Sequence, residues 1–516
     1  MPGGQAKTAK TARARLALAL AVALTLATPR GARAQGATAP ARPEAATAAA
    51  AGGGADTRAD DDDATAPAPE FVDPAFGPRY VIEDVVVRGN SRTRTALILA
   101  ELGLGPGDTL VASDPRVDTA RFRLLALGHF LDARLSVERG KQRGGVVLLV
   151  EVEERGPYII NELYPSTSAA TAFWGGADVS DTNFLGRGIN LGGAFVASTK
   201  PIVVGAERGL GLRLHGSLPE RQGPGGFGLA ATALYNDGSE FYRQSGADGD
   251  ADPGRFTAAN VRRAGGVVGA SRLLARAWRA SLDLRGESLS AALPTTRLRT
   301  RPDGTTTPID FDVLAGDSRV ATAALTLDYD TRSDPVLPRS GARVVATLEG
   351  APRPVSSYGF AKALVQASFY AKMPHGHALG LHVYGGAILG DAPYFDEFYV
   401  GDLNVLLPRR ALGMSFSTLP SHNLLHTSIA GHRYDDYAGR VLLEYAIPVW
   451  RRRGFVYGGE AFAAAGLLGM TSNGDPDVTS WRTLPVDLTG DVGLRLDTYI
   501  GIFTISIANA LSRSSF

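Results

Sequence analysis

The chain has 516 residues, which is enough for two or three domains. Its formal net charge of +1 at pH 7 provides no electrostatic footprint for nucleic acid, and its lack of cysteine excludes disulfides, thiolate metal sites and a cysteine nucleophile. The 62 glycines and 30 prolines favour many turns and argue against a largely helical protein.

Residues 1–34 have the composition of a secretory signal peptide. A basic segment precedes an apolar run at residues 16–27, and Ala32-Arg33-Ala34 fits the small-residue cleavage pattern, with Gln35 as the expected mature start. The apolar run is too short to span a bilayer, and no later stretch approaches the ~20 apolar residues of a transmembrane helix. We therefore expect the mature protein to be either soluble and exported or a membrane β-barrel.

Residues 35–78 are predicted to be a disordered linker. This segment is rich in Ala, Thr, Pro and Gly, and it has almost no large apolar side chains to offset the entropy cost of ordering. Its acidic run at residues 60–63 suggests calcium ligands as an alternative. A solvated linker is favoured, because neither a glycine turn nor a terminal glutamate completes a calcium-binding loop.

Residues 79–156 are predicted to form a separate α+β domain. Residues 80–88 alternate and are rich in Val and Ile, which indicates a strand, and residues 95–102 have helical spacing. Ser113 or Asp114 can cap a second helix that runs to about residue 127. Residues 131–138 and 146–153 are two further strands, so the order is β-α-α-β-β. We expect His129 to be a helix-end or core histidine rather than a functional one.

Residues 157–516 are predicted to consist of about 14 to 16 strands joined by turns, counting arms around residues 294–313. Many of these strands have ten residues or more, enough to cross a bilayer when tilted. Alternation is weak but visible, since Leu325, Leu327 and Tyr329 fall on one face and Thr326 and Asp328 on the other. Weak alternation over such lengths is typical of a transmembrane barrel, which must close to leave no unpaired edge in lipid. The alternative is a soluble β-sandwich.

Two polar turns stand out within this region. The stretch D-T-N-F-L-G-R-G at residues 181–188 lies between strand-like segments 172–180 and 189–199, and it predicts a tight hairpin turn through its turn-forming residues Asp181, Asn183, Gly186 and Gly188. The stretch at residues 328–341 predicts a second hairpin. There we expect Arg332 to pair locally with carboxylates such as Asp330, and proline and Gly341 to fix the reversal.

These motifs resemble those of the outer-membrane assembly superfamily that includes BamA, TamA, Sam and the two-partner-secretion transporters. The first turn resembles the opening turn of that barrel, and residues 328–341 resemble the family hairpin that begins with D-x-R and ends with P-x-x-G. The β-α-α-β-β order, with V-R-G-N at 87–90, G-D at 107–108 and L-G-H-F at 127–130, resembles a POTRA domain.

The resemblance implies a mainly β fold: a transmembrane antiparallel β-barrel of about 16 strands, of the bacterial surface antigen type, at residues 157–516, with an N-terminal α+β POTRA domain at residues 79–156. It implies a bacterial outer-membrane location with the POTRA domain in the periplasm. The expected partners are the lipid bilayer, client outer-membrane or secreted proteins, and periplasmic or lipoprotein accessory subunits. No nucleic acid is expected.

The resemblance also assigns roles in the long loop at residues 391–437. In the superfamily the sixth outer loop folds back into the barrel, and its Arg-Gly-aromatic tripeptide pairs with an acid on the inner wall. The matching positions are Arg410, in an Arg-Ala-Leu tripeptide that departs at the Gly and the aromatic, and Glu460, in Gly-Gly-Glu. We predict that Arg410 pairs with Glu460 as a brace for the loop. The alternative is that both charges are solvated in the lumen.

The C-terminal residue Phe516 resembles the aromatic assembly signal of outer-membrane barrels, although it falls on the opposite parity from Phe503 and Ile505. The seam between the first barrel strand, expected at residues 172–180, and the last, at residues 501–511, is predicted to be weak. Gly175 and Gly176 reduce pairing and packing in that first strand.

The resemblance predicts a protein that inserts or translocates client proteins. The POTRA sheet edge would capture a client strand, and the seam would act as the gate. The alternatives are a passive pore or small-molecule transporter on the same scaffold, and a dedicated single-partner secretion channel. Because no G-x-S-x-G, P-loop or H-E-x-x-H motif is present, we expect neither an enzyme nor a cofactor or metal site.

Overall fold

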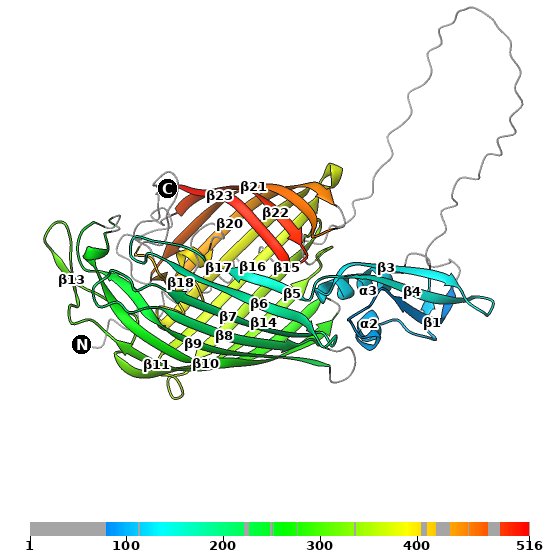
Figure 1. Cartoon of the computed structure of the whole chain (residues 1–516), viewed down its shortest axis with the longest axis horizontal. Coiled ribbons are helices and arrows are strands. Elements are labelled where there is room, and N and C mark those ends of the chain that lie inside the picture. Colours follow the sequence, from blue (N-terminus) through cyan, green and yellow to red (C-terminus); the bar gives the residue numbers. More distant parts are fainter. Residues whose placement is uncertain are drawn as a thin grey trace, which may run out of the picture.

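The computed structural model (Figure 1) describes residues 79–111, 114–220, 226–247, 250, 252–275, 277–334, 337–403, 410–418, 434–451, 454–472 and 486–514. The predicted signal peptide and linker, and Phe516, lie outside these residues. None of the helices in these ranges combines the length and the apolar character needed to cross a membrane. A small α+β domain lies beside one end of a large antiparallel barrel (Figure 1).

The N-terminal domain has two helices packed on a four-stranded sheet of order β2-β1-β4-β3, in which β1 and β4 are parallel. Its core contains Ile82, Ile98, Leu124, Leu148 and Val150. The elements are β1 (Tyr80–Arg88), α2 (Thr95–Leu102), β2 (Thr109–Leu110), α3 (Pro115–Ala126), β3 (Phe130–Arg139) and β4 (Gly145–Glu154). The short β2 was not expected from the sequence, which predicts a loop there.

Local sequence explains where the helices begin and end. The Asp114 carboxylate accepts a hydrogen bond of 2.9 Å from the backbone N–H of Arg116, and Pro115 occupies the first turn of α3. Helix α2 ends at Gly103, whose φ of +62° only glycine adopts readily.

The barrel wall contains fifteen strands in the described residues, within the predicted range of about 14 to 16, and every neighbouring pair in the wall is antiparallel. The wall begins at β5 (Tyr158–Leu163) and ends at β23 (Gly501–Ser514). Between them lie β6 (Trp174–Phe184), β7 (Ile189–Ser198), β8 (Leu210–Leu218), β9 (Phe227–Arg243), β10 (Phe256–Ala275), β11 (Trp278–Ala292), β14 (Gly316–Asp330), β15 (Gly341–Ala351), β16 (Gly359–Lys372), β17 (Ala378–Asp391), β20 (Tyr437–Arg451), β21 (Val456–Thr471) and β22 (Val486–Thr498).

Side chains alternate between the outside and the inside of this wall. On β14, Leu325 and Leu327 are exposed on the outer face, while Thr326 and Asp328 point inward and are half-buried. Similar exposed apolar side chains form a belt around the barrel, which includes Val179, Phe195, Leu214, Val268, Leu282, Leu284, Leu348, Val441, Leu443, Val492, Ile505 and Ile507. A belt of this kind is the surface that a barrel presents to lipid.

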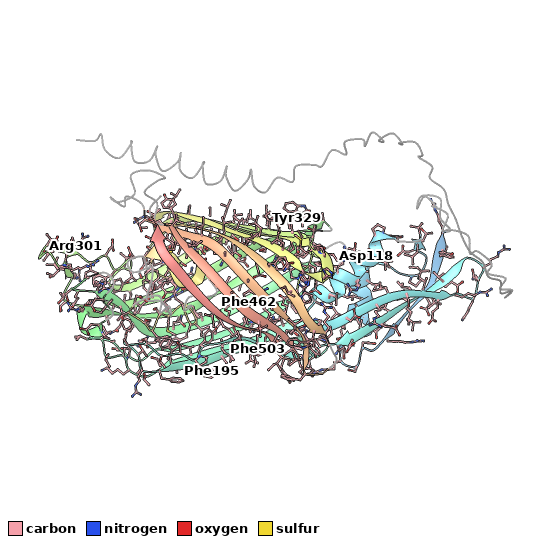
Figure 2. All side chains as sticks on the ribbon, turned by 90° about the horizontal axis from the view of Figure 1, so that it is seen from above. Asp118, Phe195, Arg301, Tyr329, Phe462 and Phe503 are labelled. Carbon is pink, nitrogen blue, oxygen red and sulfur yellow. The ribbon has the colours of Figure 1, made fainter. Side chains whose placement is uncertain are left out.

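The end of the barrel beside the N-terminal domain is called the proximal end, and the opposite end the distal end. Figure 2 places Asp118 of the N-terminal domain at the proximal end and Arg301 at the distal end. The distal loops hold η1 (Pro253–Arg255), a hairpin of β12 (Leu298–Thr300) and β13 (Thr306–Pro308), and β18 (Phe398–Tyr399), α4 (Val400–Leu403) and β19 (Tyr434–Asp435), while η2 (Pro374–Gly376) is a proximal turn. The arms predicted around residues 294–313 therefore form a separate hairpin and not wall strands.

Candidate functional site: the proximal mouth and lumen of the barrel

The turn between β6 and β7, at residues 181–188, is the contact between the barrel and the N-terminal domain. The Asn183 side-chain amide donates a hydrogen bond of 2.8 Å to the hydroxyl of Thr93 and accepts one of 2.9 Å from the backbone N–H of Gly188. The backbone N–H of Arg94 donates to the carbonyl of Gly186 over 3.0 Å. The predicted hairpin turn is therefore an interface, a role that its turn-forming composition does not reveal.

The two glycines of this turn meet two separate requirements. Gly186 and Gly188 have φ of +69° and +71°, a conformation that side-chain-bearing residues adopt at a cost. A Cβ atom at Gly186 would overlap the carbonyl oxygen of Arg92, and one at Gly188 would lie 2.9 Å from a methyl carbon of Leu97. The turn itself is tightened by the carboxylate of Asp181, which accepts from the backbone N–H of Asn183 over 2.9 Å.

Glu154 at the end of β4 holds the opposing segment of the N-terminal domain in place. Its carboxylate accepts hydrogen bonds from the backbone N–H groups of Ser91, Arg92 and Thr93, at 3.0, 3.0 and 2.7 Å, and from the Ser91 hydroxyl at 2.6 Å. Burial by itself would raise the pKa of Glu154, but these hydrogen bonds outweigh it and hold the pKa below its ordinary value. The ionised carboxylate thus presents Thr93 to Asn183.

A second contact ties the connection after β4 to the last strands of the barrel. Arg155 forms an ion pair of 2.8 Å with Asp497 of β22, and both side chains are largely buried. Arg155 also lies over the ring of Tyr457 on β21, 5.7 Å from its centroid. The sequence does not predict this pair, since nothing in the local pattern relates positions 155 and 497.

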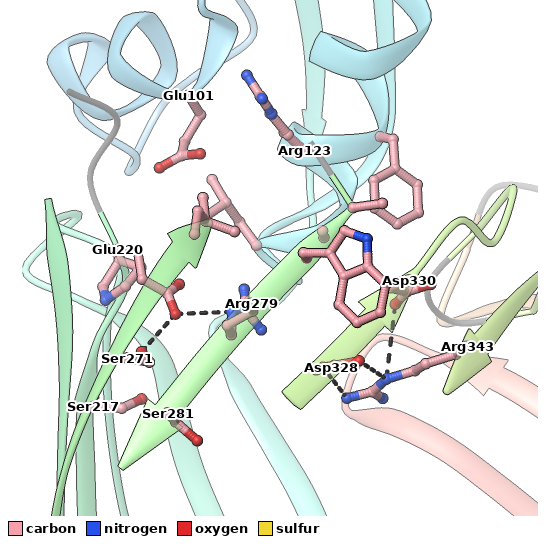
Figure 3. A pocket seen from close by; sticks show the side chains of 18 of the residues that line it. Glu101, Arg123, Ser217, Glu220, Ser271, Arg279, Ser281, Asp328, Asp330 and Arg343 are labelled. Carbon is pink, nitrogen blue, oxygen red and sulfur yellow. Dashed lines mark hydrogen bonds and ion pairs between the residues drawn. The ribbon is translucent and has the colours of Figure 1, made fainter. Parts of the chain in front are cut away.

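A cavity of 1240 Å³ lies between the N-terminal domain and the inner wall of the barrel (Figure 3). Helix α3 covers it, and the wall side is rich in hydroxyl and amide groups, which include Thr182, Asn190, Ser217, Ser271, Ser281 and Thr326. We call this cavity the vestibule. At this volume the vestibule is larger than most small-molecule sites.

Charged groups face one another across the vestibule (Figure 3). Glu220, in the β8–β9 turn, pairs with Arg279 over 2.8 Å and accepts from the hydroxyl of Ser271. Glu101 of α2 faces this pair from the N-terminal domain (Figure 3). Burial raises the pKa of Glu101 to about 7, with the charge of Glu220 adding to the rise and Arg123 and Arg279 opposing it.

The long distal loop between β17 and β20 folds into the lumen, as the resemblance implies. Phe395, Phe398 and Val400 belong to a buried cluster with Leu289 and Ile388 of the wall. Further along the loop, Phe416 stacks on Trp174 of β6 with 5.3 Å between ring centroids, Leu412 accepts from the Asn236 side chain over 2.6 Å, and the Phe416 carbonyl accepts from the Ser168 hydroxyl over 2.7 Å. Two parts of the loop are thus attached to different parts of the wall, the first to β11 and β17 and the second to β6 and β9.

The structure does not bring Arg410 and Glu460 together. Arg410 lies over the rings of Tyr399 and Tyr434, at 5.2 and 5.7 Å from their centroids, and donates to the carbonyl of Phe395. The two oxygens of Glu460 pair instead with other arginines, Arg339 at 2.7 Å and Arg495 at 3.0 Å. The predicted brace is not formed, because Glu460 lies toward the proximal end of β21 whereas Arg410 remains with the distal loop.

A different ion pair braces the loop, with the charges exchanged relative to the prediction. Asp396 of the loop forms an ion pair of 2.7 Å with Arg285 of β11, which also pairs with Glu287 at 2.7 Å. Arg263 of β10 pairs with Glu287 at 2.8 Å and lies over the ring of Phe395, 3.7 Å from its centroid. The acid is therefore on the loop and the arginines are on the wall. The sequence signal for this brace is weak: two arginines on the adjacent strands β10 and β11, four residues apart in the register of the pair.

The hairpin turn between β14 and β15 contains the local pair expected from the sequence. Arg332 contacts the Asp330 carboxylate through two nitrogens, at 3.0 and 2.7 Å. Gly341, with φ of +96°, leaves no room for a Cβ atom beside the backbone of Thr331 and Arg332. This turn is at the proximal end, below the N-terminal domain.

The seam of the barrel lies between β5 and β23, which corrects the seam expected from the sequence. The segment at residues 172–180, with Gly175, Gly176 and Val179, belongs to the second wall strand, and Val179 is paired with Ile160 of β5. Strand β5 was not expected from the sequence, because it is only six residues long. Side chains hold β5 to its neighbour, since Asn161 donates to Asp178 over 2.9 Å.

The pairing across the seam is slight. The two edge strands meet at the proximal end, where the backbone N–H of Ile160 donates to the carbonyl of Ile500 over 2.9 Å, and no ladder continues from there in the described residues. With fifteen strands that are antiparallel to their neighbours, β5 and β23 run in the same direction. Beyond the proximal end, β23 thus has an unpaired edge within the part of the wall that is described.

Comparison with known proteins identifies the N-terminal domain. Residues 80–155 match the POTRA family, described as the surface antigen variable number repeat. This segment is a POTRA domain. Among curated proteins, none matches the chain.

Solved structures with the same architecture are similar to most of the chain. CdiB from Escherichia coli has a TM-score of 0.51 at 12% identity, over 84% of this chain and 74% of that one. BamA from Haemophilus ducreyi lacking POTRA domains 1–3 has a TM-score of 0.46 at 16% identity, over 84% and 82% of the two chains. CdiB from Acinetobacter baumannii has a TM-score of 0.45 at 11% identity, over 83% and 74%. The predicted architecture, a POTRA domain followed by an antiparallel barrel, is confirmed.

Proposed function

We propose that this protein inserts client proteins into the outer membrane of a bacterium, or translocates them across it, without a catalytic step. The observation that carries the proposal is the position of the POTRA domain. It covers the vestibule at the proximal mouth and contacts β22, the strand next to the unpaired edge of β23. The proximal end is then periplasmic and the distal end faces outward, with the apolar belt in the bilayer.

Capture of the client would take place at the edge of the POTRA sheet. Strand β3 is the outer strand of that sheet, and Val137 is exposed on it. An unpaired edge offers main-chain donors and acceptors to an extended segment of almost any sequence, so strand addition accommodates varied clients. Accessory subunits in the periplasm are a further element of this proposal.

Release into the membrane would take place at the seam. Because a Cβ atom added at Gly501 would lie 3.4 Å from a methyl carbon of the Ile159 side chain, a disulfide between Ile159→Cys and Gly501→Cys would hold the seam closed in a chain that has no other cysteine. If the seam is the gate, the oxidised variant loses activity and a reductant restores it. Full activity of the oxidised variant would refute a gating seam.

Two other functions remain candidates on the same scaffold. A passive pore or small-molecule transporter is disfavoured by the loop between β17 and β20, which is attached inside the barrel to β6 through Phe416 and to β11 through Asp396 and so lies in the lumen. A dedicated secretion channel for one partner has the same structural requirements as a general assembly factor, so the geometry does not separate these two.

Depletion of the protein, followed by quantitative profiling of the outer-membrane fraction, distinguishes these functions. A joint fall of many unrelated barrel proteins indicates general assembly. Loss of one secreted or surface protein indicates a dedicated translocator. An unchanged membrane proteome would refute the assembly proposal and favour the pore.

A further inference from the structure

The turn between β14 and β15 reaches across the proximal mouth of the barrel. Arg339 in this turn forms an ion pair of 2.7 Å with Glu460 of β21, and the two side chains are 18% and 4% exposed. Strand β21 is the fourth strand round the wall from β15, which corresponds to about 19 Å along the wall at ~4.8 Å per strand. The pair is therefore made across the inside of the barrel and not along its wall.

Glu460 links this turn to the strands next to the seam. Its other oxygen pairs with Arg495 of β22 at 3.0 Å, and Arg495 also pairs with Glu444 of β20 at 2.7 Å. Arg155 of the POTRA connection holds the same strand β22 through Asp497, two positions further along. Loss of one partner from such a buried network leaves a charge without compensation, so the network holds the turn firmly.

The turn separates two cavities below the POTRA domain. Residues 331–333 line the vestibule of 1240 Å³, while Asp334, Leu337 and Arg339 line a second cavity of 460 Å³. The second cavity lies against β20–β22, on the side of the mouth nearer the seam, with Trp450 and Tyr457 in its wall. A polypeptide in the vestibule must pass this turn to reach the second cavity, which lies against β20–β22.

We propose that Arg339 is a latch: its pair with Glu460 holds residues 331–334 and 337–340 of the β14–β15 turn as a bar across the periplasmic mouth, and a client polypeptide must release this pair to pass from the vestibule to the second cavity. This inference rests on the proposed function. Arg339 is thus a positioning residue, and it takes the place at Glu460 that the resemblance assigns to Arg410. Nothing in the local pattern around Arg339 predicts this role, since its partner is 121 positions away in the chain.

The latch is tested by the width of the mouth, measured on the full chain in lipid nanodiscs. Because the chain has no cysteine, Ser281→Cys places a single thiol in the vestibule wall. The readout is the labelling rate with a bulky maleimide-polyethylene glycol divided by the rate with a small maleimide. This ratio measures access of bulky molecules and cancels changes in thiol reactivity. The variants are Arg339→Gln, Arg339→Glu, Glu460→Arg and the double charge exchange.

We expect Arg339→Gln and Arg339→Glu to raise the labelling ratio about tenfold, because each variant loses one charge-assisted hydrogen-bonded pair. The double charge exchange restores a pair of opposite charges and should lower the ratio again. The matched control is Arg343→Gln, whose partner Asp328 at 2.8 Å is on the adjacent strand, and it should leave the ratio unchanged. The latch would be overturned if Arg339→Gln left the labelling ratio unchanged. It would also be overturned if the double charge exchange gave a ratio as high as that of Arg339→Glu or Glu460→Arg alone. The measurement uses no client, so it tests the latch even if depletion refutes the proposed function.

Discussion

Replacement of Gly186 by alanine should release the POTRA domain from the β6–β7 turn. The added Cβ atom would overlap the carbonyl oxygen of Arg92, so the turn and the POTRA segment must move apart. That movement breaks the hydrogen bond from Arg94 to Gly186 and the one from Asn183 to Thr93. At about 1 kcal/mol for each hydrogen bond, docking loses about 2 kcal/mol.

The variant also carries the strain of a positive φ, which adds roughly 1 kcal/mol for alanine. Gly128 is a matched control for this strain, because it has φ of +74° and a Cβ atom added there would meet no other atom within 4 Å. The difference between Gly186→Ala and Gly128→Ala therefore isolates the loss of docking. A loss of about 2 kcal/mol corresponds to roughly a 30-fold change in the docking equilibrium.

Hydrogen–deuterium exchange of the full chain measures this difference at the Arg94 amide, which is protected only while it donates to Gly186. We expect exchange at Arg94 to be roughly 30-fold faster in Gly186→Ala than in Gly128→Ala. Equal exchange in the two variants would show that the POTRA domain is not held by this turn, and the account of residues 181–188 as an interface would be wrong.

Two further predictions concern the vestibule and the lumen loop. Burial raises the pKa of Glu101 to about 7, and we predict that docking against the barrel supplies this burial. The contribution of Glu101 to docking is then fully present below its ordinary pKa of 4.5 and is lost as the pH rises through about 7. Hydrogen exchange at the POTRA–barrel contact, corrected for intrinsic exchange, should therefore become faster from about pH 5 to about pH 8. The variant Glu101→Gln should lose this pH dependence. If the variant keeps the same pH dependence, Glu101 is not the group responsible for it. Asp396→Asn should remove the loop's pair with Arg285, worth about 3 kcal/mol when buried, and raise single-channel conductance in planar bilayers. The control Asp391→Asn removes an exposed pair with Arg353 and should leave the conductance unchanged. Equal conductance in the two variants would exclude Asp396 as the brace of the loop.

Much of the fold follows from patterns that are local in the sequence. Inside–outside alternation has a period of two residues, so Leu325 and Thr326 show their faces without reference to any other strand. Helix caps and turns are also local, as Asp114, Gly103 and the Arg332–Asp330 pair illustrate. These patterns are sufficient to predict an α+β domain followed by a β-barrel, and the resemblance of the motifs to a known family added the POTRA assignment. Strand β5, with six residues, is too short for its pattern to be distinguished from a loop.

The partners of the charged side chains were decided by the tertiary structure alone. Glu460 and Asp396 are both inside the barrel, but which arginine each one meets depends on how the strands are placed round the wall and how far each loop folds inward. That placement brings Arg339 to Glu460 and Arg285 to Asp396, across 121 and 111 positions of sequence. The sequence determines which residues face the lumen; only closure of the wall determines which of them meet, because facing side chains come from strands that share no local pattern.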